Sequence, residues 1–250
     1  MLADAEAVAE TVAEAVAERL LQERRASSQR PLGLATGRTM VPVYGALWRQ
    51  FNRLSAPEQG AIRQGWLSFN LDEYVGLAQD HPQSFAAFMQ RQLAGPLQLP
   101  GGCLQIPDGC AADPEAEACR YSAAVMAAGG IDLQLLGLGS NGHVGFNEPP
   151  CSAAEPCRCL VLSLATREQN AAAFGGDPAA VPERAITLGT AEILAARRVL
   201  LVVTGAAKAQ ILRRALQEPP CPEVPASWLQ HHPQLEVVVD QAAVAALEPS

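Results

Sequence analysis

Hydrophobic and polar residues near the N-terminus alternate with a period that predicts a helix. Four apolar residues recur every four positions, and four glutamates recur at the same interval, two positions out of phase. They are Val8, Val12, Val16 and Leu20 against Glu6, Glu10, Glu14 and Glu18. Because two residues rotate a helix by about 200°, the two sets occupy opposite faces of one amphipathic helix. The glutamates then form a solvated face.

Beyond a polar connection at residues 26–30, short apolar runs typical of buried strands alternate with helical patterns. The predicted strands are residues 32–34, 66–69, 131–138, 160–164, 185–188, 199–203 and 235–239. Helices are predicted at residues 41–51, 115–128 and 206–217, and the proline-rich residues 218–225 indicate a loop before a short helix. The alternation predicts an α/β fold of the three-layer Rossmann-like type, a mainly parallel sheet with helices on both faces. We expect residues 1–250 to form a single domain with ligands at the carboxyl ends of the strands.

Composition narrows the classes of partner. The net charge of −8 argues against nucleic acid and anionic membranes as partners. No apolar run approaches the length of a membrane span, and the acidic N-terminus is unlike a secretory signal, so a cytoplasmic protein is expected. The seven cysteines are an odd number without paired C-x-x-C units, which favours free thiols. Cys157 and Cys159 alone supply too few ligands for a closed zinc site, so no metal is expected.

The stretch LLGLGSNGHVGFNEPP contains Gly137, Gly139 and Gly142 at the spacing of a dinucleotide-binding loop. That motif requires a preceding strand, a helix that opens at the third glycine and an acidic residue about 20 positions further on. A strand is plausible here, but the prolines at 149–150 interrupt any helix, and position 162 is a leucine. We therefore interpret this stretch as a turn that presents the polar residues behind it.

Candidate catalytic residues follow two of the predicted strands. Asp72 and Glu73 come directly after residues 66–69, where an aspartate is also common as a helix cap or turn residue. His143 and Glu148 lie on the glycine-flanked loop after residues 131–138. Imidazole titrates near neutrality, and a carboxylate five residues away can orient it and keep it basic. Asp72 on one side and His143 with Glu148 on the other suggest two separate proton transfers.

A turn and a lysine suggest a site for an anion. Residues 36–39 are Thr36, Gly37, Arg38 and Thr39, between a predicted strand and a predicted helix, and Lys208 follows another strand. Backbone amides at the start of a helix together with a lysine suit a phosphate group. The turn lacks the GxxxxGK[ST] pattern, which favours a small phosphorylated metabolite over a nucleoside triphosphate.

Six ordered blocks resemble the glucosamine-6-phosphate deaminase/isomerase family, from about Leu32 to Asp240. They are GLATGRT (33–39), SFNLDEYVGL (68–77), HPQSF (81–85), GLGSNGHVGFNEP (137–149), AITLGTAEIL (185–194) and VTGAAKA (203–209). The resemblance implies an enzyme that isomerises and deaminates an amino-sugar phosphate without a metal or organic cofactor. It implies that Asp72 takes the C2 proton and returns a proton at C1, and that His143, oriented by Glu148, opens the sugar ring.

The chain departs from the family pattern at two positions. Asn141 stands where some members have aspartate, and the resemblance still implies a role for it in ring opening. Members usually read T-R-x-x-N-x-R-F, with the second arginine on the substrate phosphate, whereas this chain has Ala172 at that position. Arg38 occupies a turn position where the family commonly has a small residue. Two alternatives stay open: Arg38 compensates for Ala172, or the phosphate is bound more weakly. The short tail after Asp240 argues against carrying over allosteric activation by N-acetylglucosamine 6-phosphate.

Two other functions stay open on the sequence. A 6-phosphogluconolactonase-like hydrolase would use His143 but would not need Asp72 as a base. A catalytically silent sugar-phosphate sensor would keep the fold and bind the ligand without turnover. In every case the expected partner is a small sugar phosphate; gluco and galacto substrates are not distinguished, and a homo-oligomer stays open.

Overall fold

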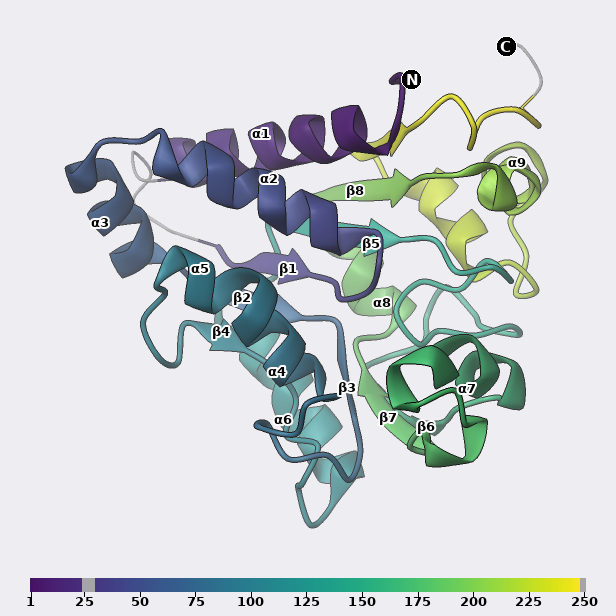
Figure 1. Ribbon diagram of the computed structural model, residues 1–250. Coiled ribbons are helices and arrows are strands. Elements are labelled where there is room, and N and C mark those ends of the chain that lie inside the picture. Colours follow the sequence, from purple (N-terminus) through teal and green to yellow (C-terminus); the bar gives the residue numbers. More distant parts are fainter. Residues whose placement is uncertain (24–29, 248–250) are drawn as a thin grey trace.

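The computed structural model describes residues 1–23 and 30–247, so most of the polar connection predicted at 26–30 lies outside the described residues. Its centre is a six-stranded sheet in the order β4-β2-β1-β5-β8-β9, with parallel pairing throughout (Figure 1). In that order the strands are Leu104–Gln105, Ser68–Asn70, Leu32–Leu34, Leu133–Gly137, Arg198–Val203 and Leu235–Val239. The predicted fold class, a mainly parallel sheet within layers of helices, is confirmed.

Helices cover both faces of this sheet. The two long helices α1 (Ala5–Glu23) and α2 (Met40–Asn52) lie side by side over one face, and α6 (Pro114–Ala127) and α8 (Thr190–Leu194) lie on the other (Figure 1). The other α-helices are α3 (Ala56–Gly65), α4 (Phe85–Met89), α5 (Gly95–Leu97), α7 (Leu164–Asn170) and α9 (Ala209–Gln217). A π-helical segment, η1 (Gln90–Ala94), and the 3₁₀ segments η2 (Ala171–Phe174), η3 (Pro178–Ala180), η4 (Ala206–Lys208) and η5 (Pro225–His231) complete the described elements. None of the helices within 1–23 and 30–247 is both long and apolar enough to cross a bilayer.

Two strands predicted for the main sheet belong to a second, smaller sheet. Strands β6 (Arg158–Val161) and β7 (Arg184–Thr187) pair antiparallel with each other, and β7 pairs with β3 (Asp72–Tyr74) in the order β3-β7-β6. The residues of β6 are partly or fully exposed, whereas the first four residues of β5 are buried. A strand buried on both faces suits the centre of a parallel sheet, and a half-exposed one suits an antiparallel edge.

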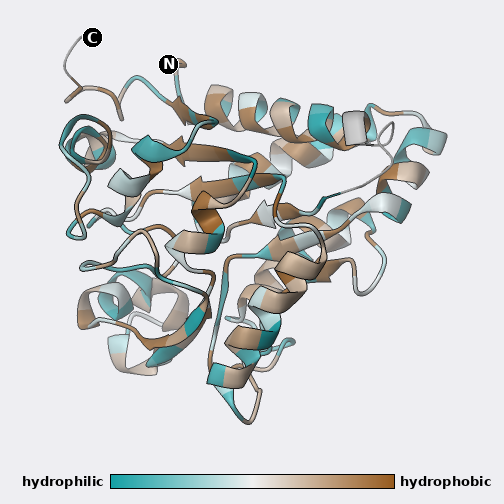
Figure 2. Cartoon of the chain, turned by 180° about the vertical axis from the view of Figure 1, so that it is seen from behind, coloured by the Kyte–Doolittle hydropathy of each residue, from teal (hydrophilic) through white to brown (hydrophobic). Residues whose placement is uncertain are grey.

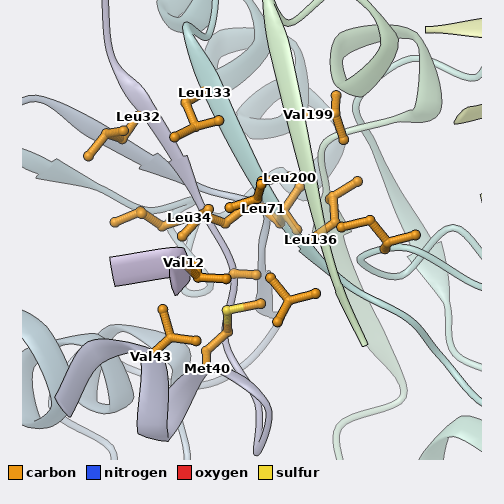
Figure 3. Packing of buried hydrophobic residues seen from close by; sticks show 14 of the residues in the cluster. Val12, Leu32, Leu34, Met40, Val43, Leu71, Leu133, Leu136, Val199 and Leu200 are labelled. Atoms are coloured by element: carbon orange, nitrogen blue, oxygen red, sulfur yellow. The ribbon is translucent and has the colours of Figure 1, made fainter. Parts of the chain in front are cut away.

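The main core lies between the sheet and the α1–α2 layer. Val12 of α1, Met40 and Val43 of α2, and Leu34 of β1 converge there with Leu71, and all are buried (Figure 3). Seen from behind, the strands of the main sheet are largely hydrophobic, whereas the helices mix hydrophilic and hydrophobic residues (Figure 2). Burial of apolar surface of this kind is the main force that holds helices on a sheet.

The amphipathic pattern of α1 is confirmed with one addition. The side chains of Val8, Val12 and Val16 are at most 1% exposed, and Glu6, Glu14 and Glu18 face solvent. Glu10 is not only a solvent-facing residue. Its carboxylate forms an ion pair with Arg49 of α2, at an N–O distance of 2.6 Å.

A buried ion pair fastens α1 to the start of the central strand. Arg19 Nε lies 2.9 Å from Asp132 Oδ2, with the two side chains 6% and 7% exposed. Arg19 also donates to the carbonyl of Arg30, and the more exposed Arg197 contacts Asp132 Oδ1 at 3.1 Å. Removal of one member of a buried pair leaves an uncompensated charge in a medium that solvates it poorly.

We expect Asp132→Ala to lower the free energy of unfolding by about 3–5 kcal/mol, because it strands the buried Arg19 guanidinium. Arg197→Ala is the matched control, since it removes a partly exposed contact from the same carboxylate and should cost about 1 kcal/mol or less. Urea unfolding followed by circular dichroism measures both. Equal losses in the two variants would contradict the assignment of the buried pair as the fastening contact.

Candidate active site

The predicted polar residues meet at the carboxyl edge of the main sheet. A cavity of about 210 Å³ is lined by the turn after β1, by Asp72 after β2, by His143 after β5 and by Lys208 after β8. The turn contributes Thr36, Gly37, Arg38 and Thr39. Strands that run parallel end at one edge, so residues far apart in the sequence are brought to the same space. Asn141 and Glu148 are not among the residues that line it.

Asp72 begins strand β3 at the junction of the two sheets. The N–H of Leu71 donates to the carbonyl of Leu34 in the main sheet, and the carbonyl of Leu71 accepts from the N–H of Leu188 beside β7. Asp72 itself pairs with Thr187, so the alternative of a helix cap or turn residue is wrong. The side-chain amide of Asn70 donates to the Asp72 carbonyl at 3.0 Å and fixes the strand start.

The Asp72 carboxyl group has the environment of a base. It is 5% exposed, and within the described chain its Oδ1 has no hydrogen-bond partner. Burial raises its pKa to about 8, and the negative charge of Glu73 adds to that rise. Proton affinity this high in a cavity-lining carboxyl group is typical of general bases, which perform best when their pKa lies near the working pH.

His143 is held as a neutral base by its own loop. Asn141 Oδ1 lies 2.6 Å from His143 Nδ1, and because an amide oxygen only accepts, Nδ1 carries the proton and Nε2 keeps its lone pair. Burial lowers the pKa of His143 to about 4, a fall that Lys208 adds to and Glu148 opposes. The ring lies over Gly139, where any Cβ would meet it at 2.3 Å. The first half of LLGLGSNGHVGFNEPP therefore forms a turn that holds the imidazole of His143 in place.

The sequence predicts that Glu148 orients His143. Within the described chain, however, the hydrogen bonds of Glu148 lead to α7, and Asn141 bonds to the imidazole. The Glu148 carboxylate accepts from the N–H and Oγ of Ser163 at 2.9 and 2.6 Å, and from the hydroxyl of Thr166. Ser163 caps α7, so Glu148 is tied to the first turn of that helix. Its influence on the imidazole is electrostatic, because its charge stabilises the protonated ring.

The turn at residues 36–39 and Lys208 face the same space with positive charge. Gly37 has φ of +104°, which a side chain would disfavour, and α2 begins directly after Thr39. Burial lowers the pKa of Lys208, and the nearby Arg38 guanidinium lowers it further. Neither cation has a carboxylate partner among the described residues, so the pair lacks a negative charge that a phosphate group would supply.

A second, larger cavity of about 520 Å³ adjoins the first and shares Thr36, Gly37 and Arg38 with it. Ala172 lies on its wall, so an arginine at that position would extend toward the same turn that holds Arg38. The sequence interpretation missed three residues that line both cavities, Phe85, Gln169 and Asn170. Phe85 lies in the block HPQSF, and Gln169 and Asn170 lie in the stretch that matches the start of the family pattern T-R-x-x-N-x-R-F.

The described residues contain no group of three or more histidine, cysteine, aspartate or glutamate side chains arranged to hold a metal ion. All seven cysteines are free, and Cys151 and Cys157 are buried. Burial raises the pKa of the Cys157 thiol to about 12, which leaves it unreactive at neutral pH.

A turn with two cations beside it, a buried carboxyl group and a neutral imidazole meet at the carboxyl edge of a parallel sheet, an arrangement typical of α/β enzymes that act on anionic substrates. A family profile described as glucosamine-6-phosphate isomerases/6-phosphogluconolactonase matches residues 3–239. The chain belongs to this family, which confirms the resemblance of the six sequence blocks.

The chain is more similar to relatives named as deaminases than to those named as lactonases. A glucosamine-6-phosphate deaminase of Hahella chejuensis is 42% identical over 250 residues, which cover 99% of this chain and 91% of that protein. A solved monomeric glucosamine-6-phosphate deaminase is 34% identical, with a TM-score of 0.89 over 98% of each chain. A 6-phosphogluconolactonase of Thermotoga maritima is 21% identical, with a TM-score of 0.73 over 96% of this chain and 97% of that one; this likeness concerns the fold alone.

Proposed function

We propose that this chain is a glucosamine-6-phosphate deaminase, which converts glucosamine 6-phosphate and water to fructose 6-phosphate and ammonia. The observation that carries the proposal is Asp72, a buried carboxyl group in the substrate cavity whose pKa is raised to about 8 and whose Oδ1 has no hydrogen-bond partner among the described residues. Opening a lactone requires a water molecule and one base, and His143 supplies that base. Deamination also requires removal of the proton on C2 of the sugar, and Asp72 is the second base that can remove it.

His143 is proposed to open the sugar ring. Its free Nε2 accepts the proton of the anomeric hydroxyl, and the imidazolium then protonates the ring oxygen as the C1–O5 bond breaks. Asn141 keeps the tautomer correct through Nδ1. The charge of Glu148 stabilises the short-lived imidazolium. The low pKa of the resting ring ensures that it begins as a base.

Asp72 is proposed to carry out the isomerisation. Its carboxylate removes the C2 proton of the open-chain sugar to give an enolamine, and the resulting carboxylic acid delivers a proton to C1. The product is a ketimine, which water hydrolyses to the ketose and ammonia. A protonated amino group on C2 of the substrate would place a positive charge beside Asp72, and such a charge favours the ionised carboxylate.

The phosphate is proposed to lie on the amides of residues 37–39 between Arg38 and Lys208. These two cations compensate for Ala172, because Arg38 faces both the substrate cavity and the space beside residue 172. Gln169 and Asn170 are added to the proposed substrate contacts, since they close the cavity from the side of α7. The hydroxyl of Ser140 donates to Gln169 at 2.9 Å and holds α7 against the loop of His143.

We further propose that the chain works as one domain in the cytoplasm. The family profile covers residues 3–239 without interruption. Seven free cysteines fit a reducing compartment. A homo-oligomer, left open by the sequence, stays a prediction.

The two activities of the family are separated by one pair of assays on the same preparation. Ammonia and fructose 6-phosphate are measured with glucosamine 6-phosphate as substrate, and acid release is measured with 6-phosphogluconolactone. We expect ammonia and ketose in equal amounts, with hydrolysis of the lactone no faster than its spontaneous rate. Enzymatic lactone hydrolysis without ammonia release would establish the lactonase instead.

A further inference from the structure

Two adjacent carboxylates of β3 face opposite ways. Side chains alternate across a strand, so Asp72 lines the substrate cavity while Glu73 points to the other face. Glu73 is 1% exposed, and a side chain at Gly109 would meet its Cγ at 3.3 Å. Two buried acids in sequence are costly unless their charges are compensated, and the ionic partner that usually does this is missing within the described residues.

Backbone N–H groups compensate Glu73 instead. Its Oε1 accepts from the N–H of Tyr74 at 2.8 Å and of Phe85 at 2.9 Å, and its Oε2 accepts from the N–H of Ala86 at 2.8 Å. Phe85 and Ala86 open α4, where N–H groups have no acceptor within the helix. Burial raises the pKa of the Glu73 carboxyl group, and the three N–H bonds partly offset that rise, because donors to both oxygens favour the ionised form.

The hydrogen bonds from Phe85 and Ala86 to Glu73 fix the position of Phe85 in the wall of the cavity. Phe85 lines both cavities, and its ring centre lies 4.7 Å from that of Tyr74 and 5.8 Å from that of Phe146, on which it is stacked. Phe146 lines the substrate cavity from the loop of His143. A shift of the first turn of α4 would move Phe85 and change the space in which the sugar is held.

The charge of Glu73 acts on Asp72 as well as on α4. Like charges on neighbouring residues make each carboxyl group hold its proton more strongly, and Glu73 has this effect on Asp72. The other titratable or charged groups around the pair come from the surrounding elements and loops. They are Tyr44 of α2, Tyr74 of β3, Tyr121 of α6, Arg38, His143 and Lys208 at the cavity, and Asp108 and Cys110 beside Gly109.

We infer that Glu73 is a positioning residue of the reaction, whose carboxylate fixes Phe85 at the start of α4 and whose charge lies next to Asp72 in the same strand. This inference rests on the proposed function, in which Asp72 is the base. It assigns the two acids of the DEY strand separate tasks. Asp72 touches the substrate, and Glu73 acts through Phe85 and through Asp72.

The test is the pH dependence of kcat/KM for ammonia release. In the wild-type enzyme kcat/KM should rise with pH through about 8, as Asp72 loses its proton. Glu73→Gln removes the charge, so the rise should move to lower pH by about half a unit or more. Its amide nitrogen cannot accept an N–H bond, so the plateau should also fall at least about fivefold. The substrate amine titrates identically with both enzymes and cancels in the comparison.

Two further variants separate charge from position. Glu73→Asp keeps the charge but shortens the reach, so it should lower the plateau about tenfold or more and leave the midpoint of the rise at the wild-type pH. Glu117→Gln is the matched control, because Glu117 is also buried, accepts from the N–H of Asp108 and pairs with Arg120. It should leave the midpoint unchanged.

If the pH midpoint of kcat/KM does not move in Glu73→Gln, the charge of Glu73 has no effect on Asp72. If all variants keep the wild-type midpoint and only lose thermal stability, Glu73 has a structural role alone. If Glu73→Gln does not fold, Glu73→Asp still decides the matter of position, since a wild-type plateau in that variant would refute it. Absence of ammonia release by the wild-type enzyme would instead refute the proposed function.

Discussion

Replacement of Asp72 by asparagine is expected to lower kcat/KM for ammonia release about 10²- to 10⁴-fold, the usual contribution of a positioned general base. The amide preserves the shape of the side chain but cannot accept the C2 proton. The carboxyl group is buried and its Oδ1 is unpaired within the described chain, so the exchange breaks no hydrogen bond of that oxygen. Steady-state assays of ammonia over a range of pH measure the effect.

Binding distinguishes loss of chemistry from loss of structure in this variant. Glucose 6-phosphate lacks the amino group and is a suitable probe, and its dissociation constant by calorimetry should change less than about threefold. Asp177→Asn is the matched control, because Asp177 is exposed and caps the short segment η3 away from the cavity. Near-normal turnover by Asp72→Asn would contradict the assignment of Asp72 as the base.

Replacement of Arg38 by glycine is expected to lower kcat/KM by about one to two orders of magnitude, chiefly through KM. A charge-assisted hydrogen bond contributes roughly 1.5–3 kcal/mol, which corresponds to that range. Arg38 is exposed, lines the cavity and forms no ion pair among the described residues, so its guanidinium is free to bind a phosphate. Inhibition by inorganic phosphate should weaken in parallel.

Addition of an arginine at position 172 should partly restore the Arg38→Gly enzyme. Ala172 lies on the wall of the larger cavity, which also contains Arg38, so the new guanidinium can reach the same turn. Arg53→Gly is the matched control for lost charge, because Arg53 lies at the far end of α2, about 20 Å along the helix. Unchanged kinetics of Arg38→Gly would exclude Arg38 as the compensating ligand.

The hydrophobic pattern predicted most of the main sheet because its inner strands, β1, β2, β5 and β8, are almost wholly buried. The runs that became β5 and β8 are almost wholly apolar, and such strands belong at the centre of a parallel sheet. The pattern did not reveal the second sheet. Strand β3 reads Asp72–Tyr74, with two acids in three residues, and it is a strand because its backbone pairs with β7, more than 100 residues later. Pairing at that separation leaves no local trace.

The site was predictable where topology alone determined it. Residues that follow parallel strands converge, so residues 36–39, Asp72, His143 and Lys208 could be predicted to share one cavity. The partners of Glu148 were not predictable, because its bonds depend on where α7 begins and on the cap at Ser163. Neither was the aromatic cluster of Tyr74, Phe85, Phe146 and Phe174, whose members come from four separate segments.

Turnover of an amino-sugar phosphate, as opposed to binding alone, distinguishes an enzyme from a sensor at this site. The wild-type enzyme is mixed with glucosamine 6-phosphate, and ammonia and fructose 6-phosphate are measured in the same sample over time. We expect both products to accumulate in equal amounts over many turnovers per enzyme molecule. Saturable binding of glucosamine 6-phosphate with no ammonia released would contradict it and would identify a sugar-phosphate sensor.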